Sequence, residues 1–524
     1  MNLLQAILAV PLLGAVAVYL ARNLGTRAAR LTALTAMGVE FLLGLALLAQ
    51  VSAGGAVEVD RPWNRAIGAS FNLRADGLSA LMVALTGLLG TVAVIAARLE
   101  IPRRVAAFHI WLLLLVAGIQ IVFVSHDALL FYFGYELMLI PAYFLIGQWG
   151  RDQFAPAAAM RFFLFTFAGS VFILAAFLKV YFANGAATGT YTFNLDALVA
   201  TGQNLPAATQ WWVFLGLLAG FAVKVPLVPF HQWLPETYAQ ASTPVALMLS
   251  GLMSKTGAYG LIRFAYPMAP EGARGLAWLV IGLALAGILY GALAAYGQRN
   301  FKALVAYSSI AHLGFVILGI ASGNALGYQG AVLQMVNHGL ATGALFLVGG
   351  LIMARTGSLS FETLGGLWAR TPALGGFLLF FALASLGLPG TGNFIGELYI
   401  VAGAFSQSAV LGALAAFGVM LGALYSLKLY IDTMQGPEKP ARPSAAATAV
   451  PIADVSSSEF ALLGTLAAAL VVIGLAPGLV TGPLQVSAAS AAASGFRPGV
   501  ATVVEGSSYP RAADARLSLP KDAQ

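Results

Sequence analysis

The chain lacks cysteine and is poor in charged residues. Zero cysteines among 524 residues exclude disulfides, thiolate metal sites, iron–sulfur ligation and a cysteine nucleophile in this chain. Asp, Glu, Lys and Arg make up 9% of the residues, whereas a soluble domain carries about 25%. Because 60% of the residues are hydrophobic and the mean hydropathy is +0.86, a soluble globular protein is excluded.

Long hydrophobic segments follow one another along most of the sequence. A membrane-crossing helix needs about 20 predominantly apolar residues, so each segment of that length is a candidate span. Fourteen candidates can be drawn, at 2–21, 31–51, 77–97, 105–124, 127–148, 157–182, 210–233, 243–266, 275–296, 299–321, 327–353, 373–405, 408–433 and 459–480. We therefore predict an all-α polytopic membrane protein with about 14 transmembrane helices.

The net charge of +7 is distributed between the apolar segments. No basic run with interleaved aromatic residues occurs, which argues against nucleic-acid binding. Lys and Arg gather in the odd-numbered loops and their flanks, which hold fifteen, against five in the even-numbered loops. Because cytoplasmic loops carry the excess of basic residues, we expect both termini on the non-cytoplasmic side.

Two segments interrupt the helical pattern in the same way. The first is 223–229 (VKVPLVP), with Pro226 and Pro229, and the second is 386–392 (LGLPGTG), with Pro389 and Gly390. Such breaks persist in a membrane only where the freed backbone groups face protein or a watery cavity. Paired broken helices at equivalent places in two halves are typical of inverted-repeat transporters and mark the ion path. Because the breaks lie five spans apart, an odd number, the two repeats are predicted to be inverted.

These features predict four regions. They are an N-terminal three-helix region (1–104), a first five-helix inverted repeat (105–266), a second five-helix inverted repeat (267–434), and a connector, last transmembrane helix and flexible tail (435–524). The Pro/Ala/Ser-rich stretch 435–458 and the Ser/Ala/Gly-rich stretch from about Thr481 onward are both typical of flexible segments.

Four charged residues lie in the middle of predicted spans: Glu136, Lys224, Lys255 and Glu397. Each such charge costs roughly 2.5–3.5 kcal/mol on insertion scales. We therefore expect these groups to be paired or hydrated, and we treat them as candidates for function.

Two histidines in later spans join this set. His312 has Ser308 four residues before it, and His338 has Thr342 four residues after it, so a hydroxyl shares the helix face of each ring. All six groups can bind and release a proton, and they lack the spacing of metal ligands. The pattern favours a proton relay over a metal site.

Structural interpretations of the same residues stay open. A buried Lys–Glu pair can serve only to fix helix registry, a carboxylate beside a Pro-Gly break can cap freed amides, and a histidine can be a packing residue. Five further polar residues are better explained by an interface, by snorkelling or by a helix end: Glu40, Lys179, His109, His126 and Asp127.

A lysine near a carboxylate can act as a proton switch. Burial disfavours the ammonium form, and a nearby carboxylate favours it. If Glu136 moved from about 4 to about 8 Å from Lys224 at an effective dielectric constant of about 20, the attraction would fall by about 2 kcal/mol. Small helix movements could thereby load and unload a proton.

Four stretches of the sequence resemble ordered motifs of one protein family. They are 133–141 (FGYELMLIP), 230–236 (FHQWLPE), 255–261 (KTGAYGL) and 388–397 (LPGTGNFIGE). They resemble the antiporter-like subunits of NADH:quinone oxidoreductase, respiratory complex I, over about residues 75–435. The resemblance is closest to the subunit M group, the counterpart of mitochondrial NADH dehydrogenase subunit 4. Glu397 carries this distinction, because the L and N groups and Mrp antiporter chains typically have lysine there.

The resemblance implies a function and a role for each candidate residue. Glu136 and Lys224 resemble the family's coupling ion pair, Lys255 the central relay, His312 and His338 the connecting relay groups, and Glu397 the exit-side proton carrier. The implied function is redox-driven proton translocation in the bacterial inner membrane. No cofactor is expected in this chain, while FMN, iron–sulfur clusters and quinone are expected on partner subunits.

The implied partners are L-like and N-like antiporter subunits, small membrane subunits, the peripheral NADH-oxidising arm and lipids. Three other functions stay open: an Mrp-type cation/proton antiporter subunit, a membrane subunit of a related hydrogenase or bicarbonate-uptake complex, and a structural scaffold. The roughly 40-residue tail is longer than this family leads us to expect.

Overall fold

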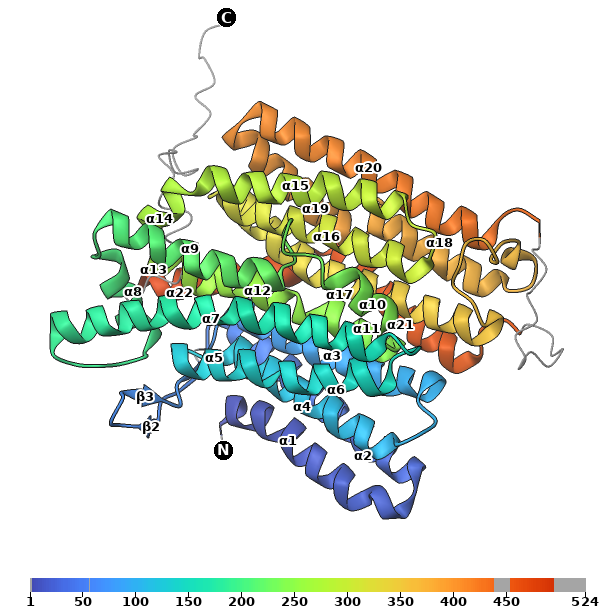
Figure 1. Ribbon diagram of the computed structural model, residues 1–524, viewed down its shortest axis with the longest axis horizontal. Helices are drawn as coiled ribbons and strands as arrows, with labels where there is room; N and C mark the ends of the chain where they lie inside the picture. The colour runs from blue at the N-terminus through green and yellow to red at the C-terminus, as the bar shows by residue number, and fades with distance from the viewer. Residues whose placement is uncertain (1, 56, 438–452, 494–524) are drawn as a thin grey trace, which may run out of the picture.

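The computed structural model describes residues 2–55, 57–437 and 453–493, with side chains described as far as residue 485. Its helices lie side by side as an elongated bundle, with α1 and α2 along one edge and α20 along the opposite edge (Figure 1). The two strand pairs in the described residues are short antiparallel ribbons and form no closed sheet. The predicted all-α membrane class is confirmed.

The N-terminal region is a three-helix unit with the two ribbons inserted before its third helix. Asn2 caps the first helix by accepting a hydrogen bond from the Leu4 amide. The elements are α1 (Leu3–Ala21), the short 3₁₀ turn η1 (Arg22–Leu24), α2 (Thr26–Ser52), β1 (Val57–Val59), β2 (Pro62–Asn64), β3 (Ala69–Ser70), β4 (Leu73–Ala75) and α3 (Gly77–Glu100). Strand β1 pairs with β4, and β2 pairs with β3.

The next set of elements corresponds to the predicted first repeat. It comprises α4 (Val105–Val124), α5 (Ala128–Leu137), α6 (Leu139–Trp149), α7 (Ala155–Thr188), α8 (Leu195–Gln203), α9 (Ala207–Lys224), α10 (Leu234–Gln240), α11 (Thr243–Met248), η2 (Leu249–Met253), α12 (Lys255–Gly260), η3 (Leu261–Ala265) and α13 (Tyr266–Met268). The run from α11 to α13 is one continuous rod that contains two π-helical turns, η2 and η3. Such turns are rare and occur mostly at functional sites.

The elements from α14 to α20 correspond to the predicted second repeat. They are α14 (Pro270–Gly275), α15 (Ala277–Tyr296), α16 (Phe301–Ala321), α17 (Ala325–Thr356), the 3₁₀ turn η4 (Leu367–Ala369), α18 (Pro372–Leu386), α19 (Gly392–Gln407) and α20 (Ala409–Met434). The broken helix is the fourth span in each predicted repeat, α9–α10 in the first and α18–α19 in the second.

The C-terminal part differs from the prediction. Helix α21 (Ser457–Leu475) matches the last predicted span, but helix α22 (Gly478–Ala493) continues where the composition favoured a flexible tail. Val480 and Leu484 are buried, and the backbone of α22 lies directly against Gly77 at the start of α3. Tertiary packing therefore orders a segment whose composition is poor in large apolar residues. Of the predicted flexible stretches, 435–458 and from about Thr481 onward, residues 438–452 and 494–524 lie outside the described residues.

The described part of the chain has 13 helices that are long and apolar enough to cross a membrane. The prediction counted fourteen spans because it took 373–405 as one, whereas the structure divides this span into the two shorter helices α18 and α19. The predicted and observed numbers of spans agree once the broken helix α18–α19 is counted as one crossing.

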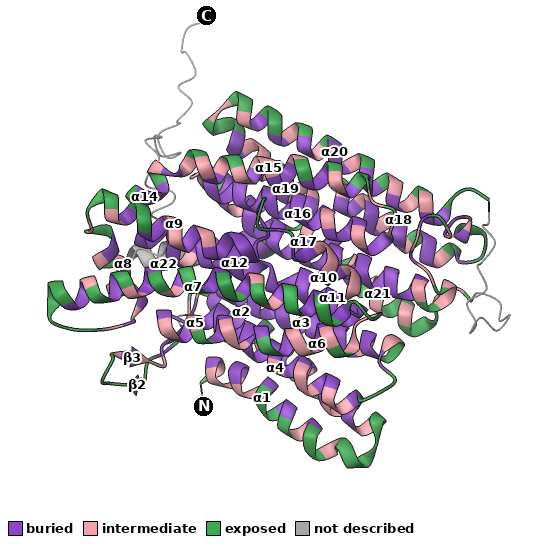
Figure 2. Cartoon of the chain, viewed as in Figure 1, coloured by how far each residue is buried: buried purple, intermediate pink, exposed green. Residues whose placement is uncertain are grey.

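The core is centred on the rod α11–α13 and on α16 and α17. Every residue in the most apolar windows of Thr243–Met268 and Ala325–Thr356 is buried, against 28% in that of α2. Figure 2 shows this pattern, with buried residues concentrated in the middle of the bundle and exposed ones on the outer helices. Polar residues on α12, α16 and α17 therefore lie far from lipid.

Candidate functional site

The first helix break follows α9, which ends at Lys224, and it includes Pro226 and Pro229. The indole of Trp233 donates a hydrogen bond to the Val223 carbonyl (2.8 Å), which would have lost its helical partner. Protein groups thus satisfy the backbone that the prolines release, as expected for a break within a membrane.

Lys224 and Glu136 lie near this break without forming a contact ion pair. The side chain of Lys224 is 1% exposed, and its Nζ has no hydrogen-bond partner among the described residues. Nζ lies instead 4.7 Å from the centre of the Tyr135 ring. Glu136 sits next to the end of α5, and its Oε1 also lacks a partner. The predicted pair therefore makes no direct contact among the described residues, although the two groups are near enough for their charges to interact.

The second break lies between α18 and α19. Gly387 and Gly390 have φ angles of +89° and +94°, which glycine adopts without the steric strain of a side chain, so they end α18 and turn the chain around Pro389. A Cβ added at Gly387 would lie 3.0 Å from Oε2 of Glu397. The break therefore brings bare backbone against the carboxylate of Glu397.

Lys255 and His338 are in direct contact at the centre of the bundle. Nζ of Lys255 lies 2.6 Å from Nδ1 of His338, and it also donates a hydrogen bond to the carbonyl of Ser250. Because Ser250 lies within η2, the π-helical turn aims this carbonyl at the amine. Both side chains are almost fully buried.

His312 and Glu397 form a second contact pair. Nδ1 of His312 lies 3.2 Å from Oε1 of Glu397, and the side-chain amide of Gln334 donates to the same carboxylate oxygen (3.1 Å). On its other side, Nε2 of His312 lies 3.1 Å from the Ser385 hydroxyl and 3.0 Å from the Tyr425 hydroxyl. Four helices thus hold one imidazole.

The two contact pairs are linked through their histidines. The ring centres of His338 and His312 lie 5.3 Å apart. The structure therefore brings Lys255, His338, His312 and Glu397 together in one buried row, carried by α12, α17, α16 and α19. We call these four residues the central row. The end of α9 packs closely against α12, because a Cβ added at Gly257 would lie 3.1 Å from Cβ of Lys224.

Three residues that hydrogen-bond to the central row were missed by the sequence reasoning: Gln334, Ser385 and Tyr425. Gln334 lies four residues before His338 on the same helix, a spacing that would have revealed it, whereas Tyr425 carries no sequence signal. The hydroxyls expected beside the rings make other bonds. Ser308 donates to the Val305 carbonyl and Thr342 to the His338 carbonyl, so neither supports an imidazole.

The remaining polar candidates lie away from the central row. Gln120 on α4 donates to Glu40 on α2 (2.6 Å), and Lys179 is exposed. Asp127 caps α5 by accepting from the Leu129 and Leu130 amides, and burial raises its pKa. His109 lies against the Val105 carbonyl, and His126 is 3.0 Å from Asp196. Lys302 is one of the fifteen Lys and Arg residues that the sequence places in the odd-numbered loops and their flanks. It is fully buried, with Nζ donating to the Ala241 carbonyl.

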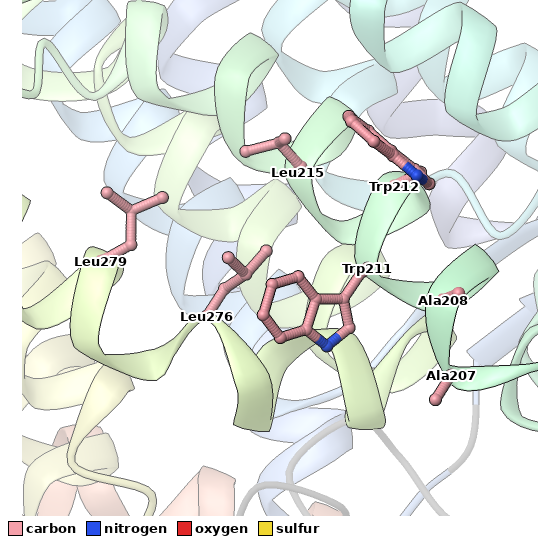
Figure 3. Close-up of a pocket in the computed structure, with 7 residues that line it drawn as sticks. All are labelled: Ala207, Ala208, Trp211, Trp212, Leu215, Leu276 and Leu279. Carbon is pink, nitrogen blue, oxygen red and sulfur yellow. The ribbon is translucent and has the colours of Figure 1, made fainter.

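An apolar groove lies on the outer surface beside the start of α9. It has a volume of about 570 Å³ and is lined by Ala207, Ala208, Trp211, Trp212, Leu215, Leu276 and Leu279 (Figure 3). Because none of these side chains titrates, the groove has no chemistry that bears on the central row.

A close crossing of two glycines holds Lys255 beside His338. A Cβ added at Gly339 would lie 2.8 Å from the Gly251 carbonyl oxygen, so Gly339→Val should push α17 away from η2 at a cost of about 1–3 kcal/mol. We expect this variant to insert into the membrane but to lose most of the activity that depends on the Lys255–His338 contact. Gly282→Val is the matched control, because a Cβ there meets no atom within 4 Å. Equal activity of the two variants would contradict a role for this contact.

The sequence and the fold are similar to those of known membrane proteins. The family model described as "NADH:quinone oxidoreductase/Mrp antiporter, TM" matches residues 125–422. The chain is 43% identical to NADH-quinone oxidoreductase subunit M of Pseudomonas aeruginosa, over 82% of each chain. Among solved structures, a chain of respiratory complex I from Thermus thermophilus with bound NADH is 31% identical, with a TM-score of 0.81 over 94% of this chain and 99% of that one.

A chain of the Mrp complex from Dietzia sp. has the same TM-score of 0.81 at 22% identity, over 96% of this chain and 100% of that one. This likeness shows a shared fold.

Proposed function

Because the chain belongs to the NADH:quinone oxidoreductase/Mrp antiporter family of membrane proteins, in its subunit M group, we propose that it translocates protons as a membrane subunit of an NADH:quinone oxidoreductase. The observation that carries the proposal is the central row. Its four groups can exchange protons and lie one after another in space, within the most buried part of the bundle.

The row gives a proton a path along the membrane plane. A proton on Nζ of Lys255 passes to Nδ1 of His338, from the His338 ring to the His312 ring, and from Nδ1 of His312 to the carboxylate of Glu397. Each step moves one proton from a donor nitrogen to an acceptor lone pair, so no electron leaves the chain. The buried and unpartnered Nε2 of His338 and the amides of Asn337 and Asn393 are groups that an internal water molecule can bind along this path.

Lys224 and Glu136 supply the coupling in this proposal. When the carboxylate of Glu136 approaches Lys224, it favours the ammonium form, and when it withdraws, the proton is released toward Lys255.

The redox chemistry belongs to partners in this proposal. FMN, iron–sulfur clusters and quinone lie on other subunits, and this chain holds no cofactor. Its neighbours are L-like and N-like antiporter subunits, small membrane subunits and lipids, with the peripheral NADH-oxidising arm in the same complex. The location is the bacterial inner membrane, with both termini on the non-cytoplasmic side, as the Lys/Arg distribution indicates.

An Mrp-type cation/proton antiporter subunit is the second candidate, because the fold is shared with an Mrp complex. Glu397 argues against it, since the resemblance implies lysine at this position in Mrp chains. Sodium-dependent proton exchange would support it.

A native gel of mildly solubilised membranes tests the proposal. The gel is stained for NADH-dependent dye reduction and probed with an antibody to this chain. We expect the chain to migrate with a large NADH-oxidising band. Migration apart from that activity would contradict the proposal, and a hydrogenase band or sodium-dependent proton exchange would then identify the alternative.

A further inference from the structure

A second polar cluster lies on the same rod as Lys255, toward one end of the bundle. Tyr259 is four residues after Lys255 within α12, so the two side chains share a helix face. The Tyr259 hydroxyl donates to the Phe123 carbonyl (2.9 Å) and lies 3.0 Å from the Ser79 hydroxyl. Tyr259 and Ser79 are each 1% exposed. The hydroxyls of Tyr259 and Ser79 thus form a side branch of the central row, which begins one helical turn from Lys255. We call it the Tyr259 branch.

The branch ends at an ion pair. Nη2 of Arg263 lies 2.7 Å from Oδ1 of Asp76 and donates to the Ser79 hydroxyl (3.2 Å). Its guanidinium also lies over the Tyr259 ring, 5.2 Å from the ring centre. The π-helical turn η3 carries Arg263 and sets its register relative to Tyr259. Tyr328 lies nearby on α17, with its buried hydroxyl unpartnered.

The pair stands at the border between the core and the surface. The side chain of Arg263 is 10% exposed and that of Asp76 is 21% exposed, whereas Tyr259 and Ser79 behind them are sealed off. Asp76 precedes α3 and caps it by accepting from the Ser79 amide (3.0 Å). This is the end at which Asn2 contacts Glu58, and thus the side of the chain's N-terminus.

Asp76 keeps its charge at any pH that a cell experiences. Burial opposes its ionisation, but the charge of Arg263 and hydrogen bonds from Arg263 and Ser79 outweigh burial and lower its pKa to about 2. Because the folded-state pKa lies below the ordinary value of 3.8, the stabilisation is present above that value and is lost only as the pH falls through about 2.

We propose that Arg263, held by Asp76, is an electrostatic barrier that closes a side route from Lys255 to the nearer membrane surface through the hydroxyls of Tyr259 and Ser79. This inference rests on the proposed function. A fixed positive charge in a narrow polar passage repels a hydrated proton, as arginine does in other pores. Since arginine does not deprotonate in proteins, the barrier cannot itself pass the proton on.

The barrier gives direction to the relay. A proton on Lys255 faces two sets of polar groups, His338 on one side and the Tyr259 branch on the other. When the Tyr259 branch is closed, the proton can pass only to His338, and from there through His312 to Glu397. A pump in which the branch conducted would return protons across the membrane without work.

The test uses the whole complex reconstituted into liposomes, with passive proton entry measured without NADH after a potassium diffusion potential is imposed. We expect Arg263→Gln to raise the leak per complex about tenfold or more. Arg263→Lys keeps the charge but can release its proton, so it should leak less than Arg263→Gln. The amount of complex is measured by NADH-dependent dye reduction. The double variant Arg263→Gln/Tyr259→Phe should restore a tight membrane, because it removes the hydroxyl that carries the route.

Three results would overturn the inference: a tight Arg263→Gln variant, an Arg263→Lys variant as leaky as Arg263→Gln, or a double variant that stays leaky. If Arg263→Gln fails to assemble, Arg263→Gln/Asp76→Asn removes both charges, leaves no unpaired ion and should leak to the same extent. Since the leak is measured without redox turnover, failure of this inference leaves normal NADH-driven pumping in the wild type. Failure of the proposed function would remove that pumping itself.

Discussion

Replacing Lys224 with methionine is expected to lower NADH-driven proton pumping by about 100-fold, within the range of a lost proton-transfer group. The complex should still assemble. Nζ of Lys224 has no hydrogen-bond partner in the part of the chain that the structure describes, so its removal leaves no donor or acceptor there newly unpaired. Methionine also fills nearly the same volume beside Tyr135 and Phe162, so the packing around the first break is kept.

Lys224→Arg separates two roles of this residue. Arginine keeps the positive charge but cannot release its proton. If Lys224 serves only as a fixed partner for Glu136, the arginine variant should pump nearly as well as the wild type. If it loads and unloads a proton, as we propose, the arginine variant should fail like the methionine variant.

The measurement is quenching of a pH-sensitive dye in membrane vesicles, divided by the NADH-oxidising activity of the assembled complex. Lys179→Met is the matched control, because Lys179 is an exposed lysine on α7. Undiminished pumping by Lys224→Met would remove Lys224 from the coupling step.

The main features of the fold could be predicted because membrane physics leaves few alternatives. Apolar segments of spanning length must be helices, and the prolines at 226 and 389 must interrupt them. The end of the chain could not be predicted in the same way. Helix α22 is ordered by contacts with α3 that leave no pattern in its Ser/Ala-rich sequence.

The candidate site was predictable in its charged members and not in its contacts. Ionisable side chains in mid-span are conspicuous in an apolar sequence, which is why Lys255 and Glu397 could be named at once. Their neighbours could not, because Tyr425 is an ordinary residue until the fold places its hydroxyl on His312. The same reasoning explains Lys302, whose loop position suggested a topology signal, although the turn before α11 buries it.

The separation of Glu136 and Lys224 could not be predicted from sequence either. The sequence places an acid in the fifth predicted span and a base in the seventh. The distance between them depends on how α5 packs relative to the end of α9. That distance is the variable that the proposed coupling uses. A single sequence is compatible with both arrangements.

Replacing Glu397 with glutamine is expected to stop pumping almost completely, again by about 100-fold. Glutamine has the shape of glutamate and can accept the hydrogen bond from Gln334 that now reaches Oε1, so assembly should be unaffected. It cannot take up a proton from His312, which lies 3.2 Å from that oxygen. The last step of the central row is therefore lost while its geometry stays.

Glu397→Lys should retain partial function, because it restores a group that exchanges protons. The side chain of Gln334 can adapt, since its Oε1 has no partner and can accept from a lysine amine. The resemblance supports this expectation, because the sibling groups carry lysine there. Pumping is measured per assembled complex, with Glu362→Gln as the control for an exposed glutamate.

The order of the three activities decides between the two explanations of Glu397. A proton carrier requires wild type above Glu397→Lys and Glu397→Lys above Glu397→Gln, because only the first two titrate. A residue that merely caps amides freed by the second break requires the opposite order for the variants, since glutamine can still accept from an amide and an ammonium cannot. Glutamine activity equal to the wild type would take Glu397 out of the path and leave His312 as the last group of the row.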